Sequence, residues 1–166
     1  PGSAQQIREA MITDGEIIEV QVEGWKAVHY ALGSDAATLH DLSAGRVPAA
    51  WTPLETTTTA EAVFLAPLDH VSARGRAKVL FGFDYVWEVY KPEHQRKFGY
   101  YTLPILHDGQ LIGRVDAKSY RAERRLEVRH VHLEPWCAAG QAPPAGGECL
   151  DQEAMLAGVG EAMGSL

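Results

Sequence analysis

The segment between residues 84 and 133 constrains the fold most, because short alternating runs of apolar and polar residues follow one another there with little room between them. Asp108-Gly109 lies between two of these runs and can supply the positive φ angles of a tight hairpin turn. We expect four strands, over residues 84–91, 100–106, 110–117 and 125–133. Closely spaced antiparallel strands of this kind predict a small barrel or a highly curved sheet.

The first 46 residues predict a helix followed by a two-stranded ribbon. Ile7 and Met11 follow helical spacing, and Gly15 stands where a helix would end. Two alternating runs, EIIEVQV and WKAVHYAL, then predict strands over 16–22 and 25–32. A helix followed by such a ribbon is typical of the back half of a winged helix, with the ribbon as the wing.

Three further helices are expected. The first begins at Asp35 as N-cap, the second is capped by Ser72 and closed by Gly82, and the third covers 150–163. On the third, Leu156, Val159 and Met163 share one face. The chain is thus expected to be an α+β protein: a winged-helix remnant, a small antiparallel β-barrel and a C-terminal helix. Its expected parts are a tag-cleavage remnant at 1–3, the winged-helix remnant at 4–46, a linker at 47–62, the barrel at 63–136, a flexible linker at 137–149 and the C-terminal helix at 150–166.

Composition narrows the functional classes. No apolar run approaches the ~20 residues of a membrane span, and no signal peptide is visible, so we expect a cytoplasmic protein. We also expect the protein to be monomeric and to bind no small-molecule cofactor. Cys137 and Cys149 are the only cysteines and are expected to be reduced. The net charge is −7, yet residues 70–130 hold twelve Lys/Arg against seven Asp/Glu. An acidic chain with a basic middle indicates an acidic partner for that middle segment, or a solvated strand face with interspersed charges.

The stretch VWEVYKPEHQRKFGYYTLP, residues 86–104, is the best candidate site. We expect a hairpin whose tip carries cations suited to phosphate contacts or to the narrow minor groove. Phe98 beside the tip fits an apolar wedge or packing beneath the hairpin, with packing favoured. Arg125 would widen the basic surface. The residues predicted to bind double-stranded DNA are Lys91, His94, Gln95, Arg96, Lys97, Arg114, Lys118 and Arg124.

Other chemistry is weaker in the sequence. His130 and His132 would share one strand face near Cys137, which allows a zinc site but supplies too few ligands, so no metal is predicted. No glycine-rich phosphate loop is present. Asp69 could act as a general base, although a helix cap is the favoured role. No catalytic residue is therefore assigned.

Residues 63–135 resemble the C-terminal barrel region of the winged-helix DNA glycosylases of the YcaQ/AlkZ type. The family's pattern is LFGF-[DE]-Y, then E-x-Y, a K/R-R-x-GYY-x-LP segment and a GR-x-D strand. Here it falls on Leu80–Tyr85, Glu88 and Tyr90, Arg96, Lys97, Gly99, Tyr100, Tyr101, Leu103 and Pro104, and Gly113, Arg114 and Asp116. A weaker likeness covers residues 4–32, where EVQVEGWKAVHYAL resembles the wing of the family's last winged helix.

This resemblance implies tandem winged helices, a β-barrel and hydrolysis of the N-glycosidic bond of bulky alkylated or crosslinked purines in DNA. It also implies that a Gln-x-Gln or Gln-x-Asp motif in the N-terminal part of the family positions or activates water. QVE at 21–23 stands in the expected wing, so the role does not pass to Gln21 or Glu23. The leading hypothesis is accordingly the DNA-binding C-terminal portion of a bacterial repair glycosylase, inactive by itself.

Three alternatives stay open at this point. One is a winged-helix regulator or architectural module that binds DNA without chemistry. Another is a structural barrel whose basic hairpin contacts an acidic protein. The third is a hydrolase complete in these residues, which would use Asp69 with His70 or His94.

Overall fold

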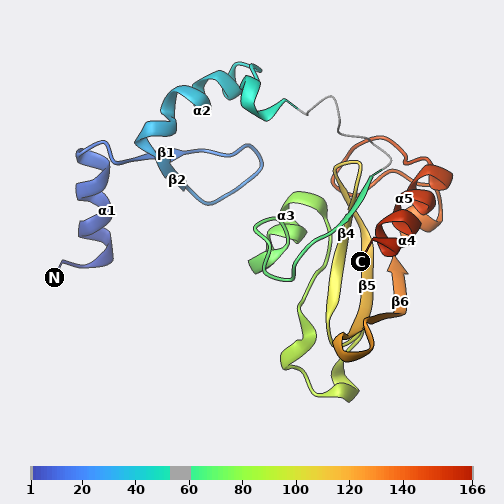
Figure 1. The fold of residues 1–166 in the computed structure, drawn as a ribbon. Coiled ribbons are helices and arrows are strands. Elements are labelled where there is room, and N and C mark those ends of the chain that lie inside the picture. Colours follow the sequence, from blue (N-terminus) through green and yellow to red (C-terminus); the bar gives the residue numbers. More distant parts are fainter. Residues whose placement is uncertain (1, 53–60, 166) are drawn as a thin grey trace. The chain divides into compact units, whose positions relative to one another are not determined.

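The computed structural model of the chain describes residues 2–52 and 61–165. The chain divides into two compact units, with the boundary after residue 55. The first unit holds a two-stranded sheet and the second a four-stranded one (Figure 1). The mixture of helices and antiparallel strands confirms the α+β class. Within the described residues no helix is long and apolar enough to cross a lipid bilayer.

The first helix has well-defined ends. Helix α1 (Ala4–Thr13) begins at Ser3, whose hydroxyl accepts the N–H of Gln6 while the Gln6 side chain accepts the N–H of Ser3. These reciprocal bonds form a capping box, which satisfies two backbone donors that a helix start leaves free. Gly15 then adopts φ 73°, the left-handed conformation that ends helices and that glycine adopts without steric cost.

An antiparallel ribbon follows α1, as predicted. Its strands, β1 (Ile17–Val20) and β2 (His29–Leu32), are shorter than expected because residues 21–28 form no strand. Helix α2 (Ala36–Ser43) comes next, but Asp35 makes no side-chain cap to it. The order of helix, strand and strand is that of the expected winged-helix remnant, while the winged-helix identity stays a prediction.

The second unit is built on an open antiparallel sheet. Its strands in spatial order are β3 (Ala62–Phe64), β4 (Thr102–His107), β5 (Gln110–Tyr120) and β6 (Arg125–Leu133). Strands β3 and β6 form the two edges and do not pair with each other, so the sheet in the described part of the chain is not a closed barrel. The expected strand at 84–91, which would have extended the sheet, does not form.

In place of that strand, residues 84–101 form an irregular segment that we call the 84–101 loop. It contains two single-turn 3₁₀ helices, η4 (Glu88–Tyr90) and η5 (Glu93–Gln95). The expected hairpin over 86–104 is therefore wrong, although its last residues do enter β4. The other 3₁₀ turns among the described residues are η1 (Gly33–Asp35), η2 (Ala49–Trp51), η3 (Ala73–Gly75) and η6 (Arg121–Glu123).

The alternating pattern at the start of the 84–101 loop has a different cause from strand pairing. Phe83 and Tyr85 bury their rings in the core, and the Tyr85 hydroxyl donates a 2.8 Å hydrogen bond to the carbonyl of Thr102. Burial raises the pKa of Tyr85 to about 12, because the charged phenolate would lose its hydration. Phe83 and Tyr85 are thus each held by the burial of their own ring in the core, and no backbone hydrogen bonds to a neighbouring strand are needed.

The hairpin turn between β4 and β5 confirms the strongest sequence signal. Asp108 and Gly109 have φ angles of 44° and 69°, as the tight turn requires. The register shifts once in this pair, between Ile105 and Leu106. This irregularity allows Ile112 and Val115, three residues apart, to face the same core, which a regular strand would prevent.

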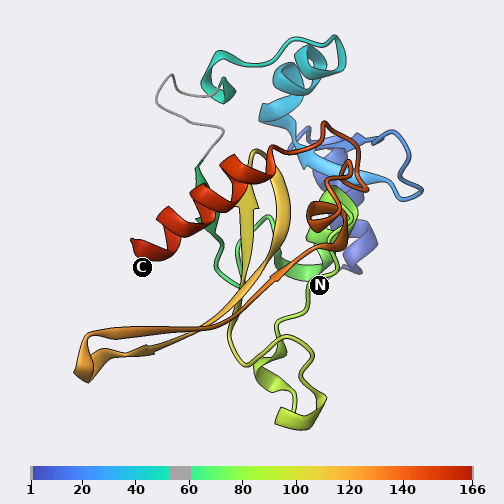
Figure 2. The same cartoon turned by 90° about the vertical axis from the view of Figure 1, so that its right-hand side faces the viewer.

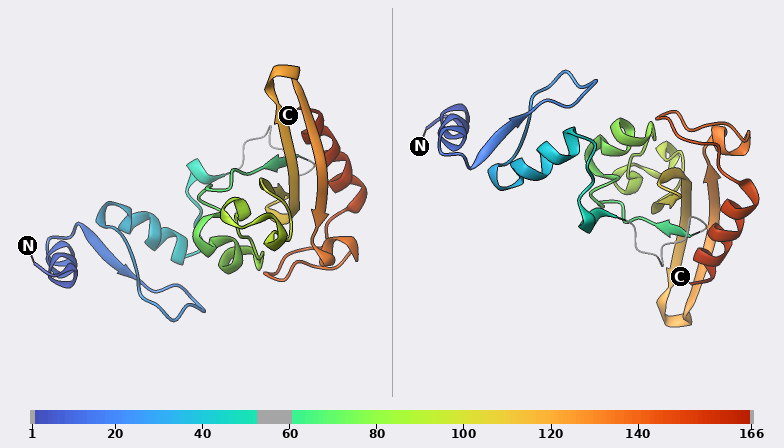
Figure 3. Two further views of the ribbon diagram at one scale, coloured as in Figure 1. Left: turned by 90° about the horizontal axis from the view of Figure 1, so that it is seen from below. Right: turned by 90° about the horizontal axis from the view of Figure 1, so that it is seen from above.

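Both faces of the sheet are covered (Figure 3). Helix α5 (Gln152–Gly164) covers one face, over a core made of Ala62, Ile105, Ile112, Val115, Cys137, Met155 and Val159. On the other face lie α3 (Arg76–Phe81) and the start of the 84–101 loop, with a smaller core made of Ala77, Phe83, Tyr85 and Leu111. The 84–101 loop is therefore fixed to the sheet at its beginning.

The C-terminal segment packs differently from the prediction. Cys137, in the short helix α4 (Pro135–Ala138), is buried, so it belongs to the core and not to a flexible linker. Burial raises the pKa of its thiol to about 11. On α5 the buried side chains are Met155 and Val159, whereas Leu156 is exposed.

Helix α3 also begins later than expected. Ser72 does not cap it, since the Ser72 hydroxyl is buried and donates to the carbonyl of Ala66. Gly82, at φ 66°, ends the helix as predicted. Residues 53–60 of the expected linker at 47–62 lie outside the described residues, as does the first residue of the expected tag remnant.

Candidate nucleic-acid interface

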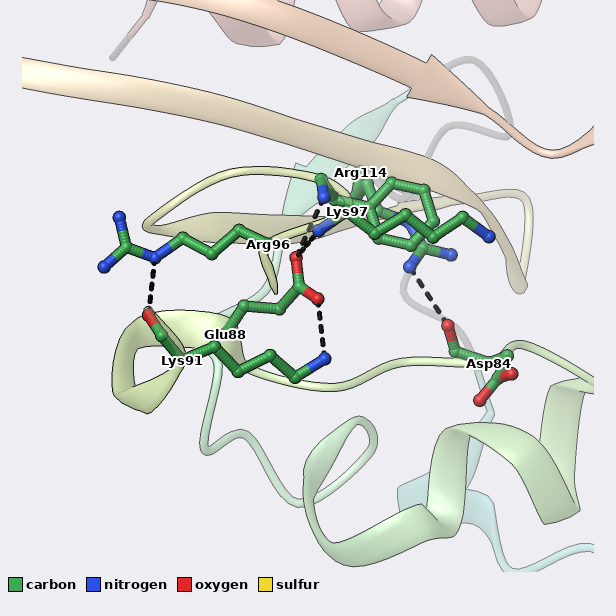
Figure 4. A network of polar contacts seen from close by, with 7 residues as sticks. Asp84, Glu88, Lys91, Arg96, Lys97 and Arg114 are labelled. Carbon is green, nitrogen blue, oxygen red and sulfur yellow. Dashed lines mark hydrogen bonds and ion pairs between the residues drawn. The ribbon is translucent and has the colours of Figure 1, made fainter. Parts of the chain in front are cut away.

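Glu88 organises the 84–101 loop from within (Figure 4). Its side chain is buried, and its Oε2 accepts the backbone N–H groups of Lys97 and Phe98, each at 2.8 Å. Its Oε1 accepts Nζ of Lys91, also at 2.8 Å. A single carboxylate therefore supplies the acceptors that a neighbouring strand would otherwise have offered to these donors.

The environment of Glu88 keeps it ionised. Burial by itself raises the pKa of the carboxyl, but the hydrogen bonds from Lys91, Phe98 and Lys97 outweigh that effect and lower the pKa below its ordinary value. The negative charge in turn holds Lys91, whose side chain is 41% exposed, in an ion pair. Lys91 is consequently a structural cation with part of its charge neutralised, although it was predicted to contact DNA.

Arg96 and Lys97 are the cations of the loop that are not paired with a described carboxylate. The Nε of Arg96 donates to the carbonyl of Lys91, and the guanidinium lies 4.7 Å from the centroid of the Tyr100 ring. The Nζ of Lys97 lies 4.8 Å from the centroid of the Phe98 ring, and the side chain is exposed. Both charges are thus held against aromatic rings, which limits their freedom before any ligand arrives.

His94 and Gln95 form the exposed tip of the loop in η5. Their side chains contact each other, with 3.2 Å between Nε2 of Gln95 and Nε2 of His94. These two groups can donate or accept hydrogen bonds, so they suit contacts with phosphate or sugar oxygens. Their assignment to DNA stays a prediction.

Arg114 lies inside the protein, which contradicts its expected place on an exposed basic surface. It is 2% exposed, and its guanidinium lies 4.3 Å from the ring centroid of Phe83 and 3.9 Å from that of Phe98. It donates to the carbonyl of Asp84 at 3.0 Å and to Oε1 of Glu134 at 2.7 Å. The residue therefore connects the 84–101 loop to the sheet and is unavailable to a ligand.

A second basic element extends beyond the sheet. The far halves of β5 and β6, residues 117–128, form a hairpin that we call the arm, and it projects away from the rest of the unit (Figure 2). Four exposed cations lie at its end: Lys118, Arg121, Arg124 and Arg125. The arm and the 84–101 loop both lie in the lower part of the unit in Figure 1, and Figure 2 shows that they project from it in different directions.

An aromatic ring supports two of the arm's cations. The ring centroid of Tyr120 lies 4.6 Å from Nζ of Lys118 and 4.1 Å from the guanidinium of Arg125. The Tyr120 hydroxyl donates to Glu127, and this hydrogen bond is the main cause that lowers the pKa of that carboxyl. Arg124 adopts φ 49°, the left-handed conformation that turns the chain into β6.

Sequence reasoning found only part of the arm. Lys118 and Arg124 were predicted for the interface and Arg125 for its margin, whereas Arg121 was missed. The turn around residues 119–123 was recognised, and four cations within eight residues of that turn were the signal that could have identified the arm.

Two hollows lie between the 84–101 loop and the β5–β6 face. One, of about 320 Å³, is lined by Arg96, Lys97, Arg129, His130 and His132 among others. The second, of about 580 Å³, is lined by aromatic and apolar residues, which are Tyr100, Tyr101, Leu103, Ala117 and Leu126, and by the polar or charged residues Glu93, Arg96, Asp116, Lys118, Ser119 and Arg129. Arg96, Tyr100, Glu93, Asp116 and Arg129 border both, so the hollows adjoin.

The described part of the chain does not assemble the alternative zinc site. The rings of His130 and His132 stack at 5.7 Å, but Cys137 belongs to the core beneath α5. In residues 2–52 and 61–165, no three His, Cys, Asp or Glu side chains come together as a metal site would need. Asp69 accepts the N–H of Val71 at 2.8 Å in a local turn, and the alternative in which it acts with His70 or His94 stays open.

Comparison with known proteins is consistent with the geometry. A family model described as DNA glycosylase AlkZ-like matches residues 1–166. No solved structure was found to match the chain.

Proposed function

The chain belongs to the AlkZ-like DNA glycosylase family, and from this premise we propose that it is the DNA-binding C-terminal portion of a DNA repair glycosylase. The reaction proposed for the whole enzyme is hydrolysis of the N-glycosidic bond of bulky alkylated or crosslinked purines. The sequence contains no Gln-x-Gln or Gln-x-Asp motif, so the role proposed for this chain is to bind duplex DNA, with α1, β1 and β2 as the helix and wing of a winged helix.

The arrangement of cations on the arm carries the proposal. Lys118, Arg121, Arg124 and Arg125 lie at the end of a projecting hairpin, where a DNA backbone can approach without meeting the body of the protein. Arginine forms bidentate contacts with phosphate, and a cluster of such residues gains further from the release of counterions. The net charge of the chain is −7, so the rest of the chain repels DNA. A local basic element of this kind therefore directs the approach of DNA toward the arm.

The 84–101 loop supplies a second set of contacts in this proposal. Arg96 and Lys97 are held over aromatic rings, and His94 and Gln95 add neutral hydrogen-bonding groups at the tip. With the arm and the loop both in the lower part of the unit in Figure 1, a duplex would meet both elements together. Lys91 contributes indirectly, since its ion pair with Glu88 shapes the loop.

The test is fluorescence anisotropy of a labelled duplex, titrated with the chain over a series of salt concentrations. We expect binding that weakens steeply with salt, and a log–log slope that falls by about 0.9 for each phosphate contact removed. Arg121→Ala/Arg124→Ala should therefore lower the slope by roughly 2 units, and Arg96→Ala/Lys97→Ala should lower it to a similar extent.

Lys78→Ala is the matched control, because Lys78 is an exposed lysine of the same unit on α3. It should bind DNA as the original chain does. Binding that does not depend on salt, or that survives both double substitutions unchanged, would contradict the proposal and favour a protein partner for the basic residues.

A further inference from the structure

Asp116 is a buried carboxylate that the fold leaves open to the two hollows. It is 5% exposed and borders both. No residue in the described ranges donates a hydrogen bond to its carboxylate or forms an ion pair with it. The carboxylate oxygens are not among the fully buried side-chain atoms without a partner in the described residues, so they keep accessible surface toward the hollows, where a ligand can supply donors.

Gly99 allows the backbone of the 84–101 loop to pack closely against the Asp116 carboxylate. At φ 135° it has a conformation that other residues rarely adopt, and a Cβ atom at this position would overlap Oδ2 of Asp116. The backbone of the 84–101 loop therefore passes directly over the carboxylate, with no side chain between them. The loop backbone thus covers part of the carboxylate, and the part that remains accessible faces the two hollows.

The surroundings of Asp116 define the chemistry of a matching ligand. On one side is the larger hollow, whose apolar and aromatic lining suits a flat ring system, and its volume of about 580 Å³ is in the range of small-molecule sites. On the other side is the smaller hollow, where Arg96, Lys97 and Arg129 outnumber the acidic residues Glu93 and Asp116. A ligand that fits both has an apolar ring with a donor at its edge, next to an anionic group.

We infer that the two hollows bind one unpaired nucleotide, with its base in the larger hollow and its phosphate in the smaller one. The base stacks by Tyr100 and the Arg96 guanidinium, as bases do on aromatic side chains of single-strand binding proteins. Asp116 accepts a hydrogen bond from the exocyclic amino group, which cytosine presents at N4 and thymine lacks. Lys118 borders the larger hollow and belongs to the arm, so the nucleotide site continues the proposed duplex surface.

The inference rests on the proposed function for its DNA partner, and the test separates the two. Labelled duplexes with one unpaired dC, one unpaired dT or no unpaired nucleotide are titrated with the chain, together with free dCMP followed by calorimetry. We expect the dC duplex to bind at least about fivefold more tightly than the dT duplex and the fully paired one.

Two variants localise the effect. Asp116→Asn should abolish the difference between dC and dT, since an amide can both donate and accept, and it should leave the paired duplex unaffected. Ser119→Trp places a bulky ring at an exposed position on the border of the larger hollow, where it should remove the preference for unpaired nucleotides without touching the core. Circular dichroism confirms that each variant is folded.

The outcomes are distinct. Equal affinity for all three duplexes overturns the nucleotide site while duplex binding, and with it the proposed function, stands. If no duplex binds but dCMP does, and Asp116→Asn weakens it, the nucleotide site stands without the proposed function. If neither DNA nor dCMP binds, both are overturned.

Discussion

The N–H of Phe98 donates a 2.8 Å hydrogen bond to Oε2 of Glu88, ten residues earlier in the chain. The neighbouring N–H of Lys97 donates to the same oxygen. The two ends of the 84–101 loop are thus joined by a side chain in place of a backbone ladder, which explains how the loop holds a defined shape with only two single turns of 3₁₀ helix.

Glu88→Gln should destabilise this unit by roughly 1–3 kcal/mol, because it removes a charge-assisted acceptor from two backbone donors and an ammonium group. Chemical denaturation at neutral pH measures the free energy of unfolding. The control is Glu93→Gln, an exposed carboxyl of the same loop, for which the expected change is within about 0.5 kcal/mol.

The original chain and Glu88→Gln should differ in how their stability responds to acid. Since the folded state lowers the pKa of Glu88 from an ordinary 4.5, its contribution to stability is fully present above that value and is lost as the pH falls through the lower, folded-state pKa. The stability gap between the original chain and Glu88→Gln should therefore narrow below about pH 4.5. A gap that widens in acid would mean that Glu88 is protonated in the folded protein.

Arg114→Ala should cost roughly 3–5 kcal/mol, the usual effect of breaking a buried ion pair, and it should also leave Phe83 and Phe98 facing an empty space. Thermal unfolding measures the loss. Arg124→Ala removes an exposed arginine from the turn before β6 and should change stability by less than about 0.5 kcal/mol. Similar losses for the two variants would show that Arg114 is not buried in solution.

The sequence predicted the sheet well where local chemistry decides it. The Asp108-Gly109 turn determines both its own conformation and the pairing beside it, so β4, β5 and β6 begin and end close to the expected residues. Residues 84–91 failed because strand formation depends on a partner strand, and Glu88 meets the backbone of the loop in its place. Alternation of residue types cannot distinguish these two arrangements.

The candidate site was predicted only in part for a similar reason. Charge identifies a cation but not its neighbours, and Arg114 is buried because two aromatic rings from distant positions enclose it. The ion pair of Lys91 with Glu88 was not predicted either, while the contact of Lys91 with DNA stays a prediction. The hollow beside Asp116 depends on the path of the loop over the sheet, which no local pattern encodes.

Gly113→Ala should disrupt the sheet, because a Cβ at residue 113 would overlap the backbone carbonyl of His132 on β6. The matched variant is Gly109→Ala, where nothing lies within 4 Å of the added atom and only the left-handed φ of 69° opposes it. We expect a cost of about 1–2 kcal/mol for Gly109→Ala and a larger one for Gly113→Ala, both measured by denaturant unfolding. Equal costs would contradict the close approach of β5 and β6.

The alternation of side chains along β5 and β6 limits the lengths that the arm can have. Strand β5 (Gln110–Tyr120) is buried in its first half and belongs to the arm in its second, and a register shift between Asp116 and Ala117 marks the base of the arm. An insertion of one residue in each strand at the base of the arm would keep Tyr120 beside Lys118 and Arg125 but would turn all three to the opposite face. The reach of the tip can thus be lengthened or shortened only in increments of two residues per strand, about 7 Å each, and any protein that tunes this distance must do so in discrete steps.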